Sequence, residues 1–121
     1  MLKNLRSHSR GVACRFVHFT GPKGELPKGD DNSYGTQVSI LHAMDPTQEV
    51  LIAYKQNGQF LHPDHGFPCR MIIPGWIGGR QIKWLSHISV SDSHSENWYH
   101  EHDNKVRILT VCAPAPKLVA S

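Results

Sequence analysis

The sequence predicts a single α+β domain in which strands form most of the structure and pair in a mixed sheet. Short stretches of β-branched and aromatic residues recur along the chain, as is typical of strands. Glycine and proline pairs separate these stretches, and no sustained helical period is present. The 121 residues suffice for one domain at most, with a modest hydrophobic core.

The first half of the chain supplies one strand, a long loop and a segment that the pattern does not decide. Residues 15–20 alternate between polar and apolar side chains and are rich in aromatic residues, which predicts a strand. Residues 21–33 are rich in glycine, proline and acidic side chains and are expected to form a loop. Residues 37–44 fit either a short helix or an extended segment, which Pro46 would end.

Two buried strands and a hairpin turn are expected in the middle of the chain. Residues 50–54 form a continuous apolar run, and the Asn57-Gly58 pair that follows favours a tight hairpin turn. Residues 69–73 form a second apolar run, which a proline and a glycine stop. The prolines between these runs are expected to keep the connecting loop extended.

The last part of the pattern predicts one long strand and an irregular end. Residues 81–90 show an imperfect alternation of apolar and polar side chains, which indicates a strand. Residues 91–96 are expected to form a polar turn. Residues 97–105 show no period, and we expect Trp98 and Tyr99 to anchor this irregular segment.

Composition excludes several classes of protein. The 13 Lys and Arg against 10 Asp and Glu give a net charge of +3, without the basic run typical of nucleic-acid binding. No apolar stretch approaches the roughly 20 residues that span a membrane, and the basic N-terminus lacks the apolar region of a secretory signal. The three cysteines are far apart in the sequence, which does not fit a disulfide scaffold. A reducing, cytoplasmic location is therefore expected.

The most informative stretch is residues 64–85, which surrounds a short apolar strand and a glycine-rich turn with titratable or cationic side chains. These are His65, Arg70, Arg80 and Lys83. Glycines allow a backbone to approach a ligand closely, and successive turn N–H groups can bind an anion. Arginine offers a planar fork to phosphate oxygens, and lysine offers a point charge. The stretch therefore predicts a binding site for a bulky anionic ligand such as a phosphorylated cofactor.

The same stretch, with several others, resembles a known family. The matching pieces are Tyr34-Gly35-Thr36, Ala43-Met44-Asp45-Pro46, Leu51-Ile52-Ala53-Tyr54, Gln56-Asn57-Gly58, residues 64–85, Asn97-Trp98-Tyr99-His100 and Asp103-Asn104-Lys105-Val106. In this order they are similar to the molybdopterin-binding domain of the sulfite oxidase and eukaryotic nitrate reductase family. Several motifs in the correct order are more specific than one glycine motif. The resemblance extends from residue 16 to residue 106 and implies the sulfite-oxidase-type molybdopterin-binding fold.

The resemblance also implies roles for single residues. It makes His65, Arg70, Arg80, Gln81, Ile82 and Lys83 cofactor-binding residues, and it places Asn104 at the substrate. The residues alone allow less specific roles. The histidine can fix its own loop, and the cations can be solvated or paired with carboxylates for little gain in stability. An asparagine after an aspartate is also common in turns.

Two histidine clusters invite a metal interpretation that we do not favour. Residues 62–65 and 100–103 each contain two histidines and a carboxylate, but neither has the spacing of a known zinc site. We therefore expect no metal ligands among the side chains of this chain. Cys69 is expected to be a small buried apolar residue, because the resemblance implies that the cysteine ligand of molybdenum lies upstream of the matched region.

The expected function follows from the resemblance. It implies a fragment of a molybdenum-cofactor oxidoreductase, most similar to a fungal assimilatory nitrate reductase, which reduces nitrate to nitrite. The cofactor would be molybdenum-molybdopterin, with haem and FAD in missing domains, and the full-length enzyme would form a homodimer. The alternatives are a sulfite oxidase-type enzyme, a truncated inactive gene product, or a small His-rich metal-binding protein.

The resemblance divides the chain into three parts. Residues 1–14 are an unassigned N-terminal segment, residues 15–106 a partial molybdopterin-binding domain, and residues 107–121 a divergent tail. The isolated chain is expected to lack turnover. Asn104 favours nitrate over sulfite, because the family carries asparagine there in nitrate reductases and tyrosine in sulfite oxidases, and a neutral amide can donate to a nitrate oxygen.

Overall fold

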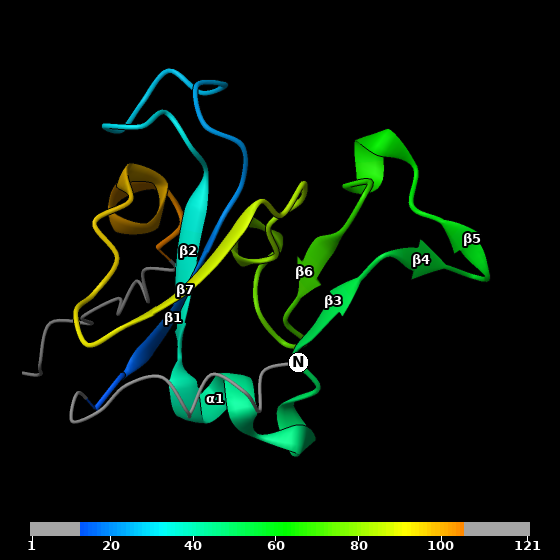
Figure 1. Ribbon diagram of the computed structural model, residues 1–121, viewed down its shortest axis with the longest axis horizontal. Helices are drawn as coiled ribbons and strands as arrows, with labels where there is room; N and C mark the ends of the chain where they lie inside the picture. The colour runs from blue at the N-terminus through cyan, green and yellow to red at the C-terminus, as the bar shows by residue number, and fades with distance from the viewer. Residues whose placement is uncertain (1–12, 106–121) are drawn as a thin grey trace, which may run out of the picture.

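The computed structural model describes residues 13–105 and consists of three small antiparallel sheets joined by short helical turns (Figure 1). The expectations for residues 1–12 and for the tail after residue 105 lie outside this range. The strand-rich α+β class predicted from the sequence is confirmed. The pairing differs from the expected mixed sheet, since every strand pair within residues 13–105 is antiparallel.

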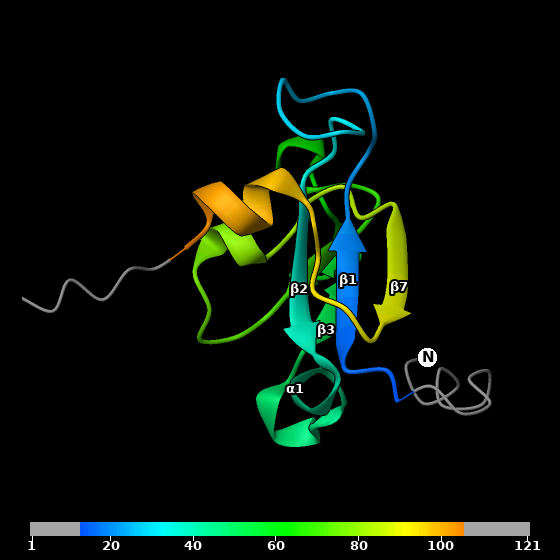
Figure 2. The same cartoon turned by 90° about the vertical axis from the view of Figure 1, so that its left-hand side faces the viewer.

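The largest sheet has three strands in the order β2-β1-β7, with bounds Gly35–Ser39, Phe16–Thr20 and His87–Ser91. Figure 2 shows β1 between its two partners. Val17 of β1 lies opposite Val38 of β2 and Val90 of β7, so the three valines form one row across the sheet. Both the strand predicted for residues 15–20 and the loop predicted for residues 21–33 are confirmed.

Residues 37–44, which the sequence pattern left undecided, contain both conformations that the pattern allowed. The strand ends at Ser39, and α1 follows at Ile40–Met44. The Ser39 hydroxyl accepts a hydrogen bond from the His42 N–H at 3.1 Å, which satisfies one of the free N–H groups of the first turn. Asp45 ends α1 and caps the 3-10 turn η2, Pro46–Gln48.

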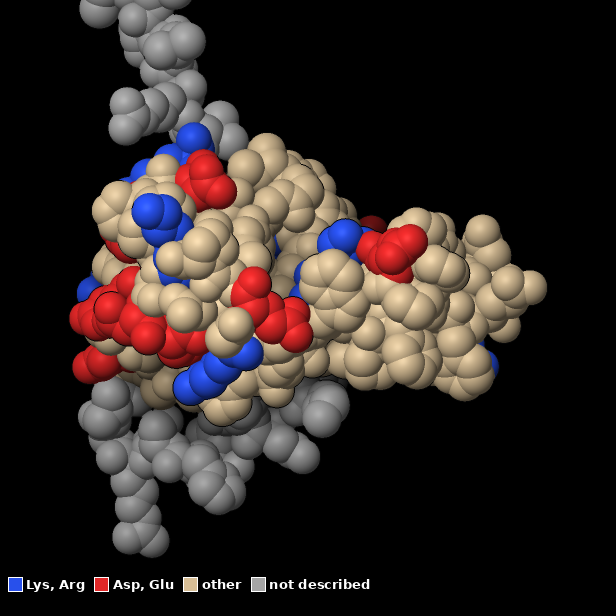
Figure 3. Space-filling view, turned by 90° about the horizontal axis from the view of Figure 1, so that it is seen from above, with Lys and Arg blue, Asp and Glu red and all other residues tan. Residues whose placement is uncertain are grey.

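Two short sheets form the part of the molecule that projects to the right in Figure 1. Strand β3, Leu51–Ala53, pairs with β6, Arg70–Ile72, and strand β4, Lys55–Gln56, pairs with β5, Gln59–Phe60. The predicted tight turn joins β4 to β5: Asn57 and Gly58 have φ values of 52° and 79°, the left-handed region that the Asn-Gly pair favours. In Figure 3 this projecting end carries few charged atoms, whereas Asp and Glu gather at the opposite end.

The hydrophobic core lies between the three-stranded sheet and β6. Its buried members are Val17, Phe19, Val38, Ala43, Met71, Ile73 and Ile82. Phe19 of β1 and Ile73, which directly follows β6, are fully buried members of this core. The burial predicted for residues 69–73 is confirmed at Met71 and Ile73, while the apolar run at residues 50–54 is only partly buried.

The long strand predicted for residues 81–90 is wrong over its first half. The 3-10 turn η4, Gly78–Arg80, precedes residues that run beside β6 without forming a strand, and only β7 is extended. The cause is the backbone at Trp84. Its φ of 52° is in the left-handed region, so the chain is not extended there, as a continuous strand would require. Single hydrogen bonds, from Met71 N–H to the Ile82 carbonyl at 2.8 Å and from Leu85 N–H to the Cys69 carbonyl at 3.0 Å, hold this segment in place.

Two further segments are more helical than predicted. The segment at residues 97–105 contains the π-helical turn η5, Tyr99–Asp103, which Figure 2 shows on the β2 side of the sheet. The connecting loop is not extended after its first proline, because η3, Pro63–His65, forms a 3-10 turn whose first N–H is accepted by the His62 ring. Proline suits such a first turn because its fixed φ is already helical.

Candidate functional site

All of the site residues predicted from the sequence except His65 line two neighbouring pockets at η4. The first pocket has a volume of about 310 Å³, and its walls include Tyr34, Arg70, Gln81, Ile82, Lys83 and Trp84. We call it the Arg70 pocket. The second has a volume of about 330 Å³ and is lined by Gly75, Trp76, Ile77, Arg80 and Asn104. We call it the Arg80 pocket. Both volumes are in the range of small-molecule and cofactor sites.

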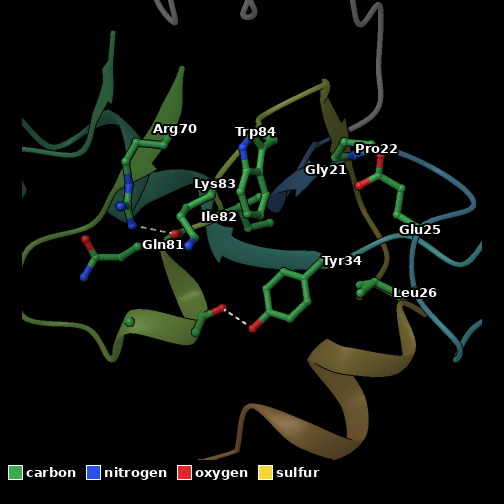
Figure 4. Close-up of a pocket in the computed structure, with 12 residues that line it drawn as sticks. Gly21, Pro22, Glu25, Leu26, Tyr34, Arg70, Gln81, Ile82, Lys83 and Trp84 are labelled. Atoms are coloured by element: carbon green, nitrogen blue, oxygen red, sulfur yellow. Dashed lines mark hydrogen bonds between the residues drawn. The ribbon is translucent and has the colours of Figure 1, made fainter. Parts of the chain in front are cut away.

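Arg70 is held at the wall of its pocket by main-chain oxygens. Its Nη1 donates to the His65 carbonyl at 3.2 Å. Its Nη2 donates to the Gln81 carbonyl at 3.1 Å (Figure 4). Its Nε is buried and has no hydrogen-bond partner in the structure. A buried unpaired donor is costly to leave unsatisfied, so this N–H is available to an acceptor on a ligand.

Lys83 brings a second cation to the same pocket. Its ammonium donates to the Asp64 carbonyl at 2.9 Å and lies 4.7 Å from the centre of the Trp84 ring. The indole N–H of Trp84 in turn donates to the Pro63 carbonyl at 2.8 Å, which ties the ring to η3. Figure 4 shows the Trp84 ring above the Tyr34 ring, with Lys83 beside Trp84 on the side of Arg70 and Gln81.

The remaining residues predicted for this pocket contribute in other ways. The Gln81 side chain is occupied by the main chain, since it accepts from Ile73 N–H at 3.4 Å and donates to the Trp76 carbonyl at 3.1 Å. Ile82 belongs to the hydrophobic core and is 2% exposed. His65 is exposed, lines neither pocket, and contributes its carbonyl to Arg70.

Arg80 is held by side chains rather than by the main chain. Its Nη1 donates to the Thr36 hydroxyl at 3.1 Å and to Nδ1 of His100. Thr36 lies on β2 and His100 on η5, and both are almost fully buried. These contacts join three elements that are far apart in the sequence around one guanidinium group.

Asn104 reaches the same pocket through a second set of contacts. Its side-chain amide donates to the Tyr34 hydroxyl, and that hydroxyl donates to the Gly79 carbonyl at 2.8 Å. Gly79 has no room for a larger side chain, because a Cβ there would overlap the Asn104 amide and lie 3.1 Å from the Tyr34 hydroxyl. Glycine at this position therefore allows the close approach of η4 to η5.

The two titratable groups of this region are perturbed by burial. Desolvation, and then the charge of Arg80, lower the pKa of His100 from 6.5 to about 4, so its ring is neutral at pH 7. Desolvation also raises the pKa of Tyr34, against a smaller opposing effect of the hydrogen bond from Asn104. The phenol therefore stays protonated and donates to Gly79.

Sequence reasoning missed three side chains that hold the predicted ones in place: Tyr34, Thr36 and His100. The first two belong to the Tyr34-Gly35-Thr36 motif, which carried the family resemblance but suggested no role. His100 belongs to the Asn97-Trp98-Tyr99-His100 motif of the resemblance, but the only role considered for it was that of a metal ligand. Among residues 13–105, no group of three or more histidine, cysteine, aspartate or glutamate side chains could hold a metal ion.

Comparison with known proteins decides the family. A sequence profile described as the oxidoreductase molybdopterin binding domain matches residues 2–99. The chain belongs to this family. The resemblance predicted from the motifs is thereby confirmed, and molybdopterin is the cofactor of the family. The match also includes the N-terminal residues that the motif comparison had set apart.

Nitrate reductases are among the curated relatives of this chain. The chain is 68% identical over 106 residues to a nitrate reductase [NADH] of Ulva prolifera and 57% identical over 106 residues to one of Volvox carteri. It is 49% identical over 102 residues to a nitrate reductase [NADPH] of the fungus Neurospora crassa. The matches cover 84–88% of this chain but only 10–12% of those relatives, so the chain spans about an eighth of the two algal proteins.

The Arg70 pocket fits a molybdopterin cofactor. The unpaired Nε of Arg70 and the ammonium of Lys83 suit an anionic group, and the two aromatic walls suit a planar ring. Gly78 leaves open space beside the pocket, because an added Cβ would meet no atom within 4 Å.

In the part of the chain that the structure describes, no helix is long and apolar enough to cross a membrane.

Proposed function

We propose that this chain forms part of the cofactor and substrate site of a molybdenum-cofactor nitrate reductase, whose complete form reduces nitrate to nitrite. The proposal rests mainly on the lining of the Arg80 pocket. The Arg80 guanidinium and the Asn104 amide line it together, beside the pocket proposed for the cofactor. Similarity to nitrate reductases over 88% of the chain supports the choice of substrate.

In this proposal the Arg70 pocket binds the cofactor. Arg70 and Lys83 face its anionic group, while His65, Gln81 and Ile82 act through their main chain and by shaping the wall. Arg80, the last residue of η4, lines the second pocket, while the two glycines before it line the first. The bound molybdenum cofactor supplies two-electron redox chemistry, and the protein supplies binding, orientation and electrostatic stabilisation.

Asn104 and Arg80 bind the substrate in this proposal. The resemblance made Arg80 a cofactor-binding residue, but Arg80 lines the pocket of Asn104 and not the Arg70 pocket. One N–H of the Asn104 amide donates to Tyr34, and the second is free to donate to an oxygen of the anion. The Arg80 charge stabilises an anion in the same pocket. Reduction of nitrate consumes two electrons and two protons and yields nitrite and water, so the net charge of the anion stays at −1.

The proposal also includes the fold, the domain bounds and the organisation of the complete enzyme. We place the strands in a sulfite-oxidase-type fold, with residues 15–106 as a partial molybdopterin-binding domain and residues 107–121 as a divergent tail. The complete enzyme is proposed to be a cytoplasmic homodimer that receives electrons through haem and FAD in other domains. Sulfite oxidation is the alternative for the same cofactor pocket.

Cofactor binding by the purified 121-residue chain tests the proposal. The chain is produced in a host that makes the molybdenum cofactor, and bound pterin and molybdenum are measured by fluorescence of the released pterin and by elemental analysis. We expect near-stoichiometric pterin in the native chain, loss of it in Lys83→Met, and retention in Lys55→Met, which removes an exposed lysine on β4.

Two results would contradict the proposal. A chain that is folded by circular dichroism but holds no pterin would exclude a self-sufficient cofactor pocket. Equal pterin content in both lysine variants would exclude Lys83 as a cofactor contact. Stoichiometric zinc in place of molybdenum would instead support the His-rich metal-binding alternative.

A further inference from the structure

We propose that His100 is a positioning residue that fixes the Arg80 guanidinium beside Asn104 by accepting its hydrogen bond at Nδ1. The substrate role of this arrangement rests on the function proposed above, because Arg80 and Asn104 matter for nitrate only if the Arg80 pocket binds it. His100 itself does not line that pocket, so its effect is exerted through the guanidinium.

The geometry places three side chains around one point. Arg80 Nη1 lies 3.1 Å from the Thr36 hydroxyl and within hydrogen-bond distance of His100 Nδ1, and the hydroxyl lies 3.2 Å from the same ring nitrogen. Thr36 is 1% exposed and His100 8% exposed, so water does not compete for these contacts. The guanidinium is thus attached on its buried side, while its residue lines the open pocket.

Donor and acceptor chemistry fixes the form of the ring. Arginine only donates, so Nδ1 must present a lone pair and the ring proton must be on Nε2. The charged and titratable groups that act on the ring are Arg80 on η4, His18 on β1, Glu101 on η5, and Lys105. Burial and the neighbouring guanidinium keep the ring neutral, since they lower its pKa to about 4.

Fixing the guanidinium before the anion arrives has a measurable benefit. A free arginine side chain loses much of its rotamer freedom when it binds an anion, and a pre-ordered one does not. The ordering cost of one long side chain corresponds to about a tenfold change in affinity. Removal of the Nδ1 acceptor should therefore weaken anion binding by about that factor.

A pair of substitutions separates positioning from packing. His100→Asn keeps an acceptor close to the place of Nδ1 but loses volume, whereas His100→Leu keeps more volume but has no acceptor. Nitrate binding to the 121-residue chain is followed by NMR at the Asn104 side-chain amide, with sodium nitrate as the probe. We expect the Asn variant to bind within about threefold of the native chain and the Leu variant about tenfold more weakly.

The ring itself gives a readout that does not depend on nitrate. Long-range ¹⁵N spectra of His100 report which nitrogen carries the proton, and we expect Nε2–H at pH 7. Thermal unfolding of both variants accompanies these measurements, because a packing role predicts that the smaller Asn side chain is the more destabilising.

Each arm can overturn the inference. A proton on Nδ1, or a doubly protonated ring at pH 7, excludes the acceptor role whatever nitrate does. Stronger nitrate binding in the Leu variant than in the Asn variant reduces His100 to a packing residue. If the native chain shows the Nε2–H ring but does not bind nitrate, the positioning of Arg80 stands and the proposed substrate of its pocket fails.

Discussion

The two pockets differ in what holds their cations. In the Arg70 pocket both cations donate to main-chain oxygens, those of Asp64, His65 and Gln81. In the Arg80 pocket the cation donates to side chains, those of Thr36 and His100. Main-chain acceptors persist when the side chain that bears them is replaced, whereas side-chain acceptors do not. The first pocket should therefore depend on the path of its loops, and the second on the identity of single residues.

The largest effect is expected where a cation of the first pocket is itself removed. Arg70→Met eliminates two charge-assisted hydrogen bonds and frees the η3 loop from the segment after η4. We expect the free energy of unfolding to fall by about 2–3 kcal/mol, as for hydrogen bonds made by a charged group, although one of the two is exposed. Urea unfolding measures the loss, and Arg15→Met, which removes an exposed arginine, is the control. Equal losses in both variants would show that the Arg70 contacts contribute nothing.

A smaller effect is expected at one of the two adjacent glycines of η4, which both line the Arg70 pocket. Gly79→Ala introduces a Cβ 2.9 Å from the Asn104 Cγ and 3.1 Å from the Tyr34 hydroxyl, so the amide must move. Gly78→Ala meets nothing within 4 Å. Overpacking of this kind costs about 1–3 kcal/mol, and we expect it only at Gly79. The Asn104 amide resonances and the unfolding free energy are the measurements; an unshifted amide in Gly79→Ala would refute the close approach.

Acid should act on the second pocket through His100. Its folded pKa of about 4 lies below the unfolded value of 6.5, so between these values the unfolded chain binds more protons. Stability from this group is therefore complete above pH 6.5, falls as the pH drops, and is constant again below about 4. We expect a loss of about 1–2 kcal/mol, allowing for the partial solvent contact of the ring.

Comparison with His100→Asn isolates this contribution, because asparagine does not titrate. The Asp31 and Asp45 carboxyls have pKa values lowered from 3.8, chiefly by hydrogen bonds from Ser33 and Thr47, so their losses occur at lower pH. The free energy of unfolding, measured with urea from pH 4 to pH 7, should rise less steeply with pH in the variant than in the native chain. An identical slope would mean that the ring titrates normally in the folded chain.

The smallest effect is expected where a side chain of the first pocket is removed but its carbonyl stays. Asp64→Ala deletes an exposed carboxylate, while Lys83 binds the main-chain oxygen of the same residue. We expect a change below about 0.5 kcal/mol and unchanged pterin content, as for exposed charges in general. A large loss of pterin would show that the carboxylate, rather than the carbonyl, positions Lys83.

The sequence predicted the first pocket better than the second, for a physical reason. The Arg70 pocket is built mostly from residues 63–84, so its charges, glycines and prolines appear together in one stretch. Even there the path of residues 81–86 was missed, because the left-handed backbone at Trp84 leaves no mark on an apolar alternation. The hairpin at Asn57 was predicted because its signal is local.

The Arg80 pocket depends on contacts that local patterns do not contain. Thr36 and His100 are 64 residues apart, and Tyr34 and Asn104 are 70 residues apart. A buried threonine or histidine looks the same in sequence whether it packs or accepts a hydrogen bond. Asn104 was singled out only through the family resemblance, and no role was predicted for the Tyr34 side chain that contacts it.

The Tyr34 hydroxyl contacts both Gly79 and Asn104, so its hydrogen bonds are complete only after Asn104 has been synthesised. This sets an order of events during biosynthesis. The walls of the Arg70 pocket are complete once Trp84 has been made, but the Arg80 pocket must wait for Asn104. Those 20 further residues take roughly 1–4 s at ordinary translation rates of about 5–20 residues per second. The residues of the proposed cofactor pocket are therefore synthesised a few seconds before those of the proposed substrate pocket.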